Sequence, residues 1–403
     1  MGQYLSLTVF SWRKLLKFSK KHKMNDIKYL VVGAGIYGSV VAERIASVLK
    51  ENVVVIDKRC HIGGNSYSEV DPETGIECHK FGSHIFHTSN ERVWKYITQF
   101  TQFTNYQHKV FSRSCNRIYT MPINLKTLND YYGLALSPSE MKEFLAREIA
   151  KAGIGDPRNL EEKAISMIGS ALYEAFIRGY TVKQWNQDPR LLPSHIITRL
   201  PVRYNYNNNY YSDALQGMPA DGYAKLFERL LTHPKIELRL ETSFASVMRA
   251  LPQTCRVIYT GMVDELLDYR YGPLGWRSLR LEWETRAIPD YQGTSVMNYG
   301  DEDIPYTRIH EFKHFHPERR SVFESGKTVI CREYSSDYTL GAEAYYPVNT
   351  DENHRRYEQY LADFKSLYPD WLIGGRLGAY QYWDMDKTIE QALLCFEQLA
   401  KRG

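Results

Sequence analysis

Two short apolar runs flank a helical pattern near the start of the chain. Residues 29–32 (YLVV) and 53–56 (VVVI) are β-branched runs bounded by turn residues, which is typical of buried parallel strands. Ile36 to Leu49, between them, has the composition and spacing of a helix. Strand, helix and strand in this order predict a βαβ unit and therefore an α/β fold.

Helical and extended patterns separate further along the chain. Residues 124–185 are predominantly helical, and within 160–179 one apolar face recurs at helical spacing. That face contains Leu160, Ala164, Ile165, Ile168, Leu172, Ala175 and Phe176. Residues 202–211 and 257–260 are short extended runs, and 276–335 contains successive strands that predict an antiparallel sheet. A strand at 372–377 and a helix at 388–399 follow.

Three glycines stand between the first strand and the helix. Gly33, Gly35 and Gly38 have the G-x-G-x-x-G spacing, and Asp57 ends the second strand nineteen residues after Gly38. These glycines permit a tight turn, close approach to a pyrophosphate, and close helix–strand packing. The helix N-terminus favours a diphosphate, and Asp57 is placed to accept hydrogen bonds from a ribose. The segment predicts dinucleotide binding.

A second glycine pair, Gly63-Gly64, follows Asp57 in the run DKRCHIGGN. This arrangement is typical of two-dinucleotide-domain flavoproteins and favours FAD over NAD. The alternative is an ordinary turn between strands.

We therefore predict a Rossmann-like FAD-binding α/β domain with an inserted helical lobe and an antiparallel β-sheet lobe. The predicted parts are a basic extension (1–23), a discontinuous FAD-binding domain (24–103, 212–275 and 345–403), a helical substrate or lid domain (121–185), and a sheet domain (104–120, 186–211 and 276–344).

Composition narrows the function classes. The six cysteines are scattered without a C-x-x-C pair, which argues for a reducing, cytoplasmic compartment and against disulfides or a zinc site. No apolar run reaches the roughly 18 residues of a transmembrane helix. The net charge is +4, but residues 1–23 hold six Lys/Arg and no acid, so the remainder stands at −2. Nucleic-acid binding therefore has no support.

The leader, residues 1–23, is basic with an aromatic and apolar face, so peripheral contact with an anionic membrane is one hypothesis. The other is that Met24 is the working start and the leader is a disordered extension.

Three further features are candidates for chemistry. His84 and His87 in GSHIFHT lack a carboxylate or thiol at a suitable offset, so we expect no metal there and favour a structural or flavin-adjacent role. Spacing alone favours core packing over ligand stacking for Trp185. Arg199 and Arg308 lie in largely apolar surroundings and are the best candidates for a diphosphate, which suits the bidentate guanidinium.

Together these residues resemble the bacterial-type UDP-galactopyranose mutase family from Lys28 to Ala400. The motifs that carry the resemblance, in order, are GAGxxG, HIGGNSY, GSHIFHT, LYEAFIRGYTVKQW, RLPVRYNYNNNYY, QGMP, MNY, PYTRI, YYPV and GGRLGAYQYWDMD. The resemblance implies a homodimeric, redox-neutral isomerase that interconverts UDP-galactopyranose and UDP-galactofuranose and supplies galactofuranose for cell-surface glycans. It implies reduced FAD, whose N5 attacks the anomeric carbon and forms a covalent flavin–sugar intermediate while UDP departs.

The resemblance also implies roles for individual residues. Trp185 would stack on uracil with Phe176, Tyr180 and Thr181 nearby; Asn105 and Asn298 would face the sugar. The catalytic set would be Arg199, Arg308 and His87, in which the two arginines hold the diphosphate with Tyr210, Tyr346 and Tyr382. The FAD would be lined by Gly33, Gly35, Tyr37, Gly38, Asp57, Gly63, Gly64, Asn65, His84, Ile85, Arg376, Tyr382, Asp384 and Met385.

Three positions depart from the family pattern. Ser83 stands where Pro or Ala often precedes the first loop histidine, and Asn186 follows KQW where Gly is usual. Asp57 stands at the ribose position in place of Glu, which the site tolerates. None of these departures removes an implied catalytic residue.

Two other functions remain open. A flavin oxidase of the amine-oxidase type shares the nucleotide fold, although the arginine pair and the KQW loop count against it. A non-catalytic FAD-binding scaffold is the third hypothesis.

Overall fold

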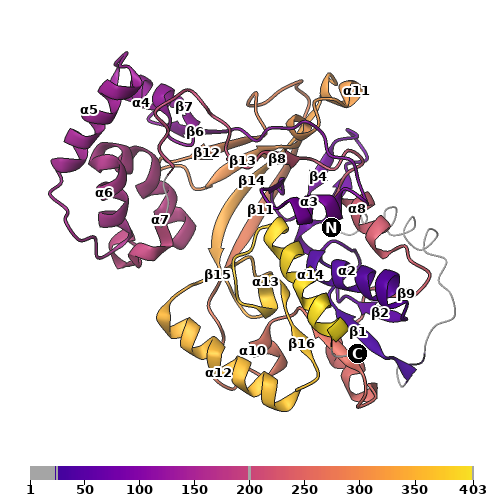
Figure 1. The fold of residues 1–403 in the computed structure, drawn as a ribbon. Helices are drawn as coiled ribbons and strands as arrows, with labels where there is room; N and C mark the ends of the chain where they lie inside the picture. Colours follow the sequence, from indigo (N-terminus) through magenta and orange to yellow (C-terminus); the bar gives the residue numbers. More distant parts are fainter. Residues whose placement is uncertain (1–22, 24–25, 198–200, 402–403) are drawn as a thin grey trace.

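The computed structural model describes residues 23, 26–197 and 201–401. A parallel sheet with flanking helices lies beside a long mixed sheet, and a group of helices stands at the far end of that sheet (Figure 1). Residues 1–22 of the predicted leader and Arg199 lie outside the described residues.

The parallel sheet confirms the predicted βαβ unit. Its strand order is β16-β10-β1-β2-β9, and all four pairings are parallel. The strands are β1 (Tyr29–Val32), β2 (Val53–Ile56), β9 (Ile236–Arg239), β10 (Arg256–Tyr259) and β16 (Leu372–Ile373). The helices α2 (Ile36–Arg44, continued by a π-helical turn, Ile45–Leu49), α8 (Tyr223–Leu231) and α14 (Met385–Lys401) pack together beside it.

The predicted strand at 372–377 is wrong beyond Ile373. Gly375 has φ +74° and begins the short helix α13 (Gly375–Gly378), so the glycine pair turns the chain out of the sheet. A side chain at Gly374 would also collide with the ring of Tyr37.

The mixed sheet has the order β15-β11-β14-β13-β12-β6-β7. The strands are β6 (Val110–Ser114), β7 (Arg117–Met121), β11 (Trp276–Arg286), β12 (Val296–Tyr299), β13 (Arg308–Glu311), β14 (Thr328–Asp337) and β15 (Tyr346–Pro347). The predicted antiparallel pairing over 276–335 is confirmed, whereas the added pair β12–β6 is parallel. The predicted extended run at 202–211 forms no strand, because Asn205 and Asn207 accept backbone N–H groups two residues ahead of each.

The helical lobe has a hydrophobic core of its own. It consists of α4 (Leu125–Tyr132), α5 (Pro138–Ala150), α6 (Leu160–Tyr173), a π-helical turn (Glu174–Arg178) and α7 (Gly179–Trp185). Of the predicted apolar face, Leu160, Ala164, Ile168, Leu172 and Phe176 are buried, and Ile165 and Ala175 are partly buried. Asn124, Ser137 and Asn159 cap the starts of α4, α5 and α6 with their side chains.

Shorter elements connect these parts. They include β3 (Ser68–Val70) paired with β4 (Glu77–His79), β5 (Phe86–Thr88) paired with β8 (Leu215–Gly217), α3 (Glu91–Ile97), α9 (Phe244–Val247), α10 (Val263–Leu266), α11 (Arg320–Phe323) and α12 (Asp351–Leu367). The exact division of the chain into domains stays a prediction.

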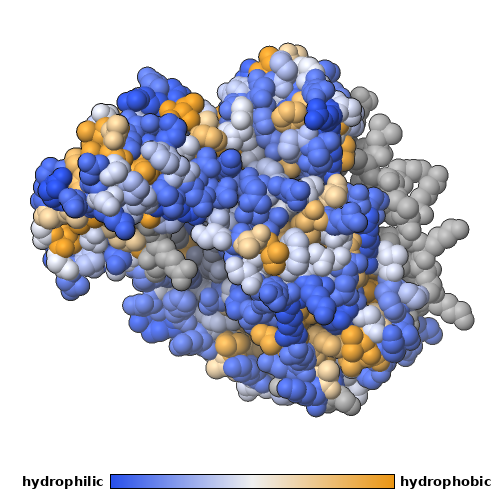
Figure 2. All heavy atoms as spheres, turned by 45° about the horizontal axis from the view of Figure 1, so that its top comes forward, coloured by the Kyte–Doolittle hydropathy of each residue, from blue (hydrophilic) through white to orange (hydrophobic). Residues whose placement is uncertain are grey.

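On the face in Figure 2, hydrophilic side chains predominate and hydrophobic residues form small, scattered groups. Within the described ranges, no helix combines the length and the apolar character needed to cross a bilayer.

Two buried histidines, His79 and His108, and the half-buried His84 predict loss of stability in acid. Burial lowers the pKa of His79 to about 3, that of His84 to about 4 and that of His108 to about 3. In the unfolded chain a histidine pKa is about 6.5. As the pH falls below about 6.5, the unfolded chain takes up protons that the folded chain does not, so the unfolding free energy decreases.

Urea unfolding at a series of pH values between about 7 and 4 measures this decrease. His79→Gln should reduce the slope of unfolding free energy against pH, and substitution of the exposed His195 should not. An unchanged slope in His79→Gln would contradict the assignment.

Candidate active site

Two cavities meet in the body of the molecule. One has a volume of about 650 Å³ and lies along the carboxyl ends of β1 and β2, and the other, about 830 Å³, lies between the mixed sheet and the helical lobe. They share the lining residues Asn65, His84, Arg376 and Met385. A long ligand can therefore pass from one cavity into the other.

Two glycines of the first loop are required by the protein itself. Gly33 has φ +107°, and a Cβ there would lie 2.1 Å from the hydroxyl oxygen of Thr260. A Cβ on Gly38 would lie 1.9 Å from the carbonyl oxygen of Gly33. These contacts confirm the turn and the close helix–strand packing expected from the motif.

Gly35 is different, because packing does not explain it. A Cβ at this position would meet only the Cα of Gly64, at an ordinary 3.8 Å. Both glycines line the 650 Å³ cavity at the start of α2. The bare backbone therefore leaves space for a ligand to approach the first N–H groups of α2, which fits a diphosphate.

Asp57 lines the same end of the cavity. Its carboxylate accepts the backbone N–H of Ala34 at 2.8 Å and that of Arg59 at 2.9 Å. These bonds hold the carboxylate in place, and each oxygen keeps a lone pair for a further donor such as a ribose hydroxyl.

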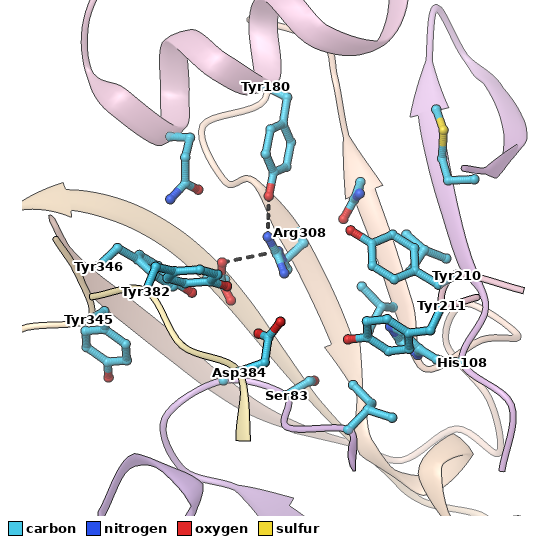
Figure 3. A pocket seen from close by; sticks show the side chains of 18 of the residues that line it. Ser83, His108, Tyr180, Tyr210, Tyr211, Arg308, Tyr345, Tyr346, Tyr382 and Asp384 are labelled. Atoms are coloured by element: carbon cyan, nitrogen blue, oxygen red, sulfur yellow. Dashed lines mark hydrogen bonds and ion pairs between the residues drawn. The ribbon is translucent and has the colours of Figure 1, made fainter. Parts of the chain in front are cut away.

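The larger cavity is centred on one arginine. Figure 3 shows Arg308 among the side chains that line the cavity, with the Tyr180 hydroxyl directed at it. Arg308 donates to the Tyr180 hydroxyl, and its Nε lies 3.2 Å from Oε1 of Glu333. Glu333 is the direct antiparallel neighbour of Arg308 on β14.

Both members of this pair, Arg308 and Glu333, are ionised near pH 7. Burial alone would lower the pKa of Arg308, but Glu333 and nearby tyrosines raise it well above its ordinary value. Burial raises the pKa of Glu333, but Arg308 and a hydrogen bond from His310 outweigh it and lower the value to about 2. The cavity thus contains a permanent cation that suits an anionic ligand.

Tyrosines form much of the remaining wall. Tyr346 and Tyr382 lie with ring centroids 5.4 Å apart, and the Arg376 guanidinium lies 5.0 Å from the Tyr382 ring. Tyr210 and Tyr211 face them in Figure 3. Such a wall presents flat apolar surface together with hydroxyl groups, which suits sugars and nucleotides.

His87 belongs to this wall as well. Its Nδ1 lies 2.8 Å from a carboxylate oxygen of Asp213, and its ring stacks on Tyr211 at 3.6 Å. These contacts fix the ring orientation.

Lys183 fastens the helix that carries Tyr180 and Trp185. Its ammonium group donates to the carbonyl oxygens of Tyr299, Asp301, Ile304 and Tyr306 at 2.7–3.3 Å. These carbonyls belong to β12 and the turn that leads to β13. Lys183 therefore sets α7 against the strands that present Asn298 and Arg308.

The C-terminus of α7 is fixed separately. Arg277 Nε and the Ser335 hydroxyl both donate to the carbonyl of Gln184, at 3.0 and 2.7 Å. Asn186 follows with φ +52°, the left-handed conformation for which glycine is preferred, and its amide donates to Asp337 at 3.1 Å.

Most residues expected from the sequence line these cavities. The nucleotide cavity is lined by Gly33, Gly35, Tyr37, Gly38, Asp57, Gly63 and Gly64; the larger one by Ile85, His87, Phe176, Tyr180, Trp185, Tyr210, Asn298, Arg308, Tyr346, Tyr382 and Asp384; and both by Asn65, His84, Arg376 and Met385. Asn105 is exposed and Thr181 is buried, and neither lines a cavity. All these roles stay predictions.

The sequence interpretation missed two residues that have structural roles at the site, Lys183 and Glu333. Lys183 lies inside the KQW motif, but nothing in the pattern indicates four carbonyl partners. Glu333 lies in the strand segment TVICREY, where an acidic residue is typical of a solvent-facing position.

One group outside the cavities has metal-ligating side chains. Ligand atoms of Asp290, Glu311 and His314 lie within 4.8 Å of one another. The Glu311 carboxylate already accepts the N–H groups of Tyr291 and Gln292 and the Thr328 hydroxyl, which gives it a structural role.

Comparisons with known proteins agree on one family. Residues 175–382 match the family model of UDP-galactopyranose mutase, and residues 31–100 match that of an NAD(P)-binding Rossmann-like domain. The chain is 40% identical to a probable UDP-galactopyranose mutase of Klebsiella pneumoniae over 92% of this chain and 94% of the relative. It is 39% identical to the dTDP-fucopyranose mutase of Escherichia coli over 93% of this chain and 99% of that relative.

A solved structure has the same fold. The crystal structure of a reduced UDP-galactopyranose mutase aligns with a TM-score of 0.71 at 16% identity, covering 94% of this chain and 96% of the other.

Lys183→Met should weaken the attachment of the helical lobe. The four carbonyls lose a charged donor, and hydrogen bonds to charged groups contribute about 1.5–3 kcal/mol each when measured singly. Because some carbonyls find other donors, we expect a total loss of about 2–4 kcal/mol in unfolding free energy. Hydrogen exchange of α7 amides should accelerate in parallel.

The control is Lys126→Met on α4, which removes an exposed i,i+4 ion pair with Asp130 and should have little effect. Equal behaviour of the two variants would contradict the role given to Lys183.

Proposed function

This chain belongs to the UDP-galactopyranose mutase family, and from that membership we propose a FAD-dependent isomerase that interconverts UDP-galactopyranose and UDP-galactofuranose. One structural observation carries the proposal. A permanent cation, Arg308, stands in the tyrosine-rich 830 Å³ cavity, and this cavity shares four lining residues with the 650 Å³ cavity.

FAD is the cofactor that suits the two joined cavities. The adenosine and diphosphate would lie along Gly33, Gly35, Gly64 and Asp57, and the flavin would reach the junction formed by Asn65, His84, Arg376 and Met385. When bound and reduced, FAD supplies the nucleophile that displaces the diphosphate from the sugar.

Arg308 is the residue we propose for the leaving diphosphate. Cleavage of the bond between the anomeric carbon and the diphosphate develops negative charge on UDP, and a fixed cation stabilises that charge. Glu333 and Tyr180 hold the guanidinium, so little reorganisation is needed when the charge develops. Arg199 remains our proposal for a second cation.

The helical lobe supplies the proposed uracil site. Phe176, Tyr180 and Trp185 line the cavity from this lobe, and Trp185 ends α7. Tyr210, Tyr346 and Tyr382 would then contact the diphosphate, and Asn298 the sugar. A side-chain oxygen of Asn298 is buried without a protein partner, which leaves it available to a ligand hydroxyl.

Assembly and location are proposals from sequence alone: a homodimer in the cytoplasm, with the leader as a contact for anionic membranes.

The proposed activity is tested with purified protein carrying FAD. After chemical reduction it should interconvert the pyranose and furanose forms of UDP-galactose, and the oxidised protein should not. The same assay with dTDP-fucopyranose distinguishes the two kinds of relative. Failure of the reduced, FAD-loaded protein with UDP-galactose would contradict the proposal, and oxygen-dependent amine turnover would favour the oxidase.

Arg308→Lys should reduce kcat by about 10²–10³-fold, because a lysine cannot keep the bidentate geometry opposite the developing charge. FAD absorbance should stay the same. The matched control is Arg332→Lys on β14, which pairs with Glu284 and lines neither cavity. Equal rates for Arg308→Lys and the parent protein would exclude the proposed role.

Trp185→Ala should weaken UDP binding by about 10–100-fold, since stacking of a base on an aromatic ring is worth about 1–3 kcal/mol. A UDP titration followed by calorimetry measures the effect. Trp371→Phe is the control. The Trp371 ring stacks on Tyr368 with ring centroids 4.1 Å apart, and Trp371 does not line the cavity of the proposed uracil site. FAD retention without any UDP affinity in the parent protein would instead support a non-catalytic scaffold.

A further inference from the structure

Three side chains form a hydrogen-bonded series from the larger cavity into the mixed sheet. Ser83 lines the cavity, and its hydroxyl lies 2.6 Å from Nδ1 of His310. Nε2 of His310 lies 2.9 Å from Oε2 of Glu333. His310 is 0% exposed and Glu333, which also borders the larger cavity, is 2% exposed, so a buried imidazole links two side chains of the cavity wall.

The carboxylate determines how the imidazole is used. Glu333 is ionised, because Arg308 and His310 hold its pKa at about 2 against the opposing effect of burial. An ionised carboxylate only accepts hydrogen bonds, so Nε2 of His310 must carry a proton. Nδ1, which faces Ser83, is then the nitrogen that gains or loses a proton.

The series has two states with the same three groups in contact. With a proton on Nδ1, His310 donates to Ser83, whose own hydroxyl proton points elsewhere and can serve the cavity. Without that proton, the Ser83 hydroxyl donates to Nδ1, and a lone pair of its oxygen can accept from the cavity. In the first state the imidazolium lies beside the Glu333 carboxylate.

Three further imidazoles lie near His310. The imidazoles of His79, His84 and His108 interact electrostatically with His310, and burial lowers the pKa of each to about 3 or 4. They are therefore neutral near pH 7. The charged groups beside His310 are Glu333 and Arg308, and the Phe312 ring packs against its face.

We propose that Ser83, His310 and Glu333 form a proton relay for the ring opening and ring closure of the sugar. This inference rests on the proposed function. Pyranose-to-furanose conversion adds a proton to the oxygen on C5 and removes one from the hydroxyl on C4, so the substrate chemistry requires a temporary donor and acceptor.

The proton balance of the relay closes over one turnover. On ring opening, Ser83 gives its hydroxyl proton to the C5 oxygen and takes the Nδ1 proton of His310. On ring closure, the C4 hydroxyl gives its proton to the Ser83 oxygen, and the Ser83 proton returns to Nδ1. Glu333 stays ionised throughout and holds the imidazole in place.

Ser83→Ala and His310→Gln test the relay in the FAD-loaded, reduced protein. Each should lower kcat by about 10²-fold, the usual contribution of general acid–base catalysis, with the KM and the Kd for UDP unchanged. The double variant should be no slower than the slower single variant, because the two residues act as one unit. Ser83→Thr, which keeps a hydroxyl, should restore the rate. The matched control is His316→Gln, which removes another buried histidine–carboxylate contact, with Glu77, outside both cavities.

A second readout does not depend on turnover. In ¹⁵N-histidine NMR of the oxidised protein, Ser83→Ala should shift the Nδ1 resonance of His310 and leave that of His316 unchanged. An unshifted resonance would show that the contact between Ser83 and His310 is absent in solution and would overturn the relay.

The outcomes separate the two proposals. Parent protein that converts UDP-galactose, with Ser83→Ala and His310→Gln equally active, overturns the relay and leaves the isomerase standing. A rise in KM and UDP Kd at unchanged kcat assigns the residues to structure only and also overturns it. Parent protein that converts no sugar overturns the proposed function, and the role of the relay with it.

Discussion

The site depends on the pairing of Arg308 with Glu333 across β13 and β14. Register places the two residues directly opposite each other, so the cation and its counter-charge are set by the same sheet that forms the cavity floor. A charge taken out of water without a partner is expensive, and Glu333 supplies that partner for a half-buried guanidinium that faces a cavity rich in tyrosine. The Tyr180 hydroxyl from the helical lobe adds a third point of support.

The pairing of Arg308 with Glu333 also links residues that line the two cavities. Ser83 precedes His84, which lines both cavities, and it contacts Glu333 through His310. The loop beside the proposed cofactor is therefore connected to the proposed diphosphate residue by two hydrogen bonds and the ion pair of Glu333 with Arg308.

The helical lobe is a separate hydrophobic unit that must be held at the correct distance from the sheet. Its core is its own, so packing inside the lobe does not position Tyr180 or Trp185 over the cavity. The lysine-to-carbonyl contacts of Lys183 and the two donors to the Gln184 carbonyl do so instead. Asn186 then changes the chain direction at the end of α7 in a left-handed conformation, which glycine adopts most readily.

What the sequence alone determined are the features that arise from neighbours along the chain. The βαβ unit, its glycine loop with Asp57, and the buried face of α6 follow from local periodicity and turn chemistry, and the structure confirms them. The motifs also identified the family, and most of the residues that they predicted line the two cavities.

What only the tertiary structure decided are contacts between segments far apart in sequence. The parallel placement of β6 beside β12, the four carbonyl partners of Lys183 and the series from Ser83 to Glu333 each join residues more than a hundred positions apart. The position of Asn105 is also decided by the tertiary structure. The family resemblance implied a contact with the sugar, whereas in the fold Asn105 is exposed and does not line the cavity. Hydrogen bonds and strand register between distant segments depend on how whole elements pack, and no local pattern of residue types records that arrangement.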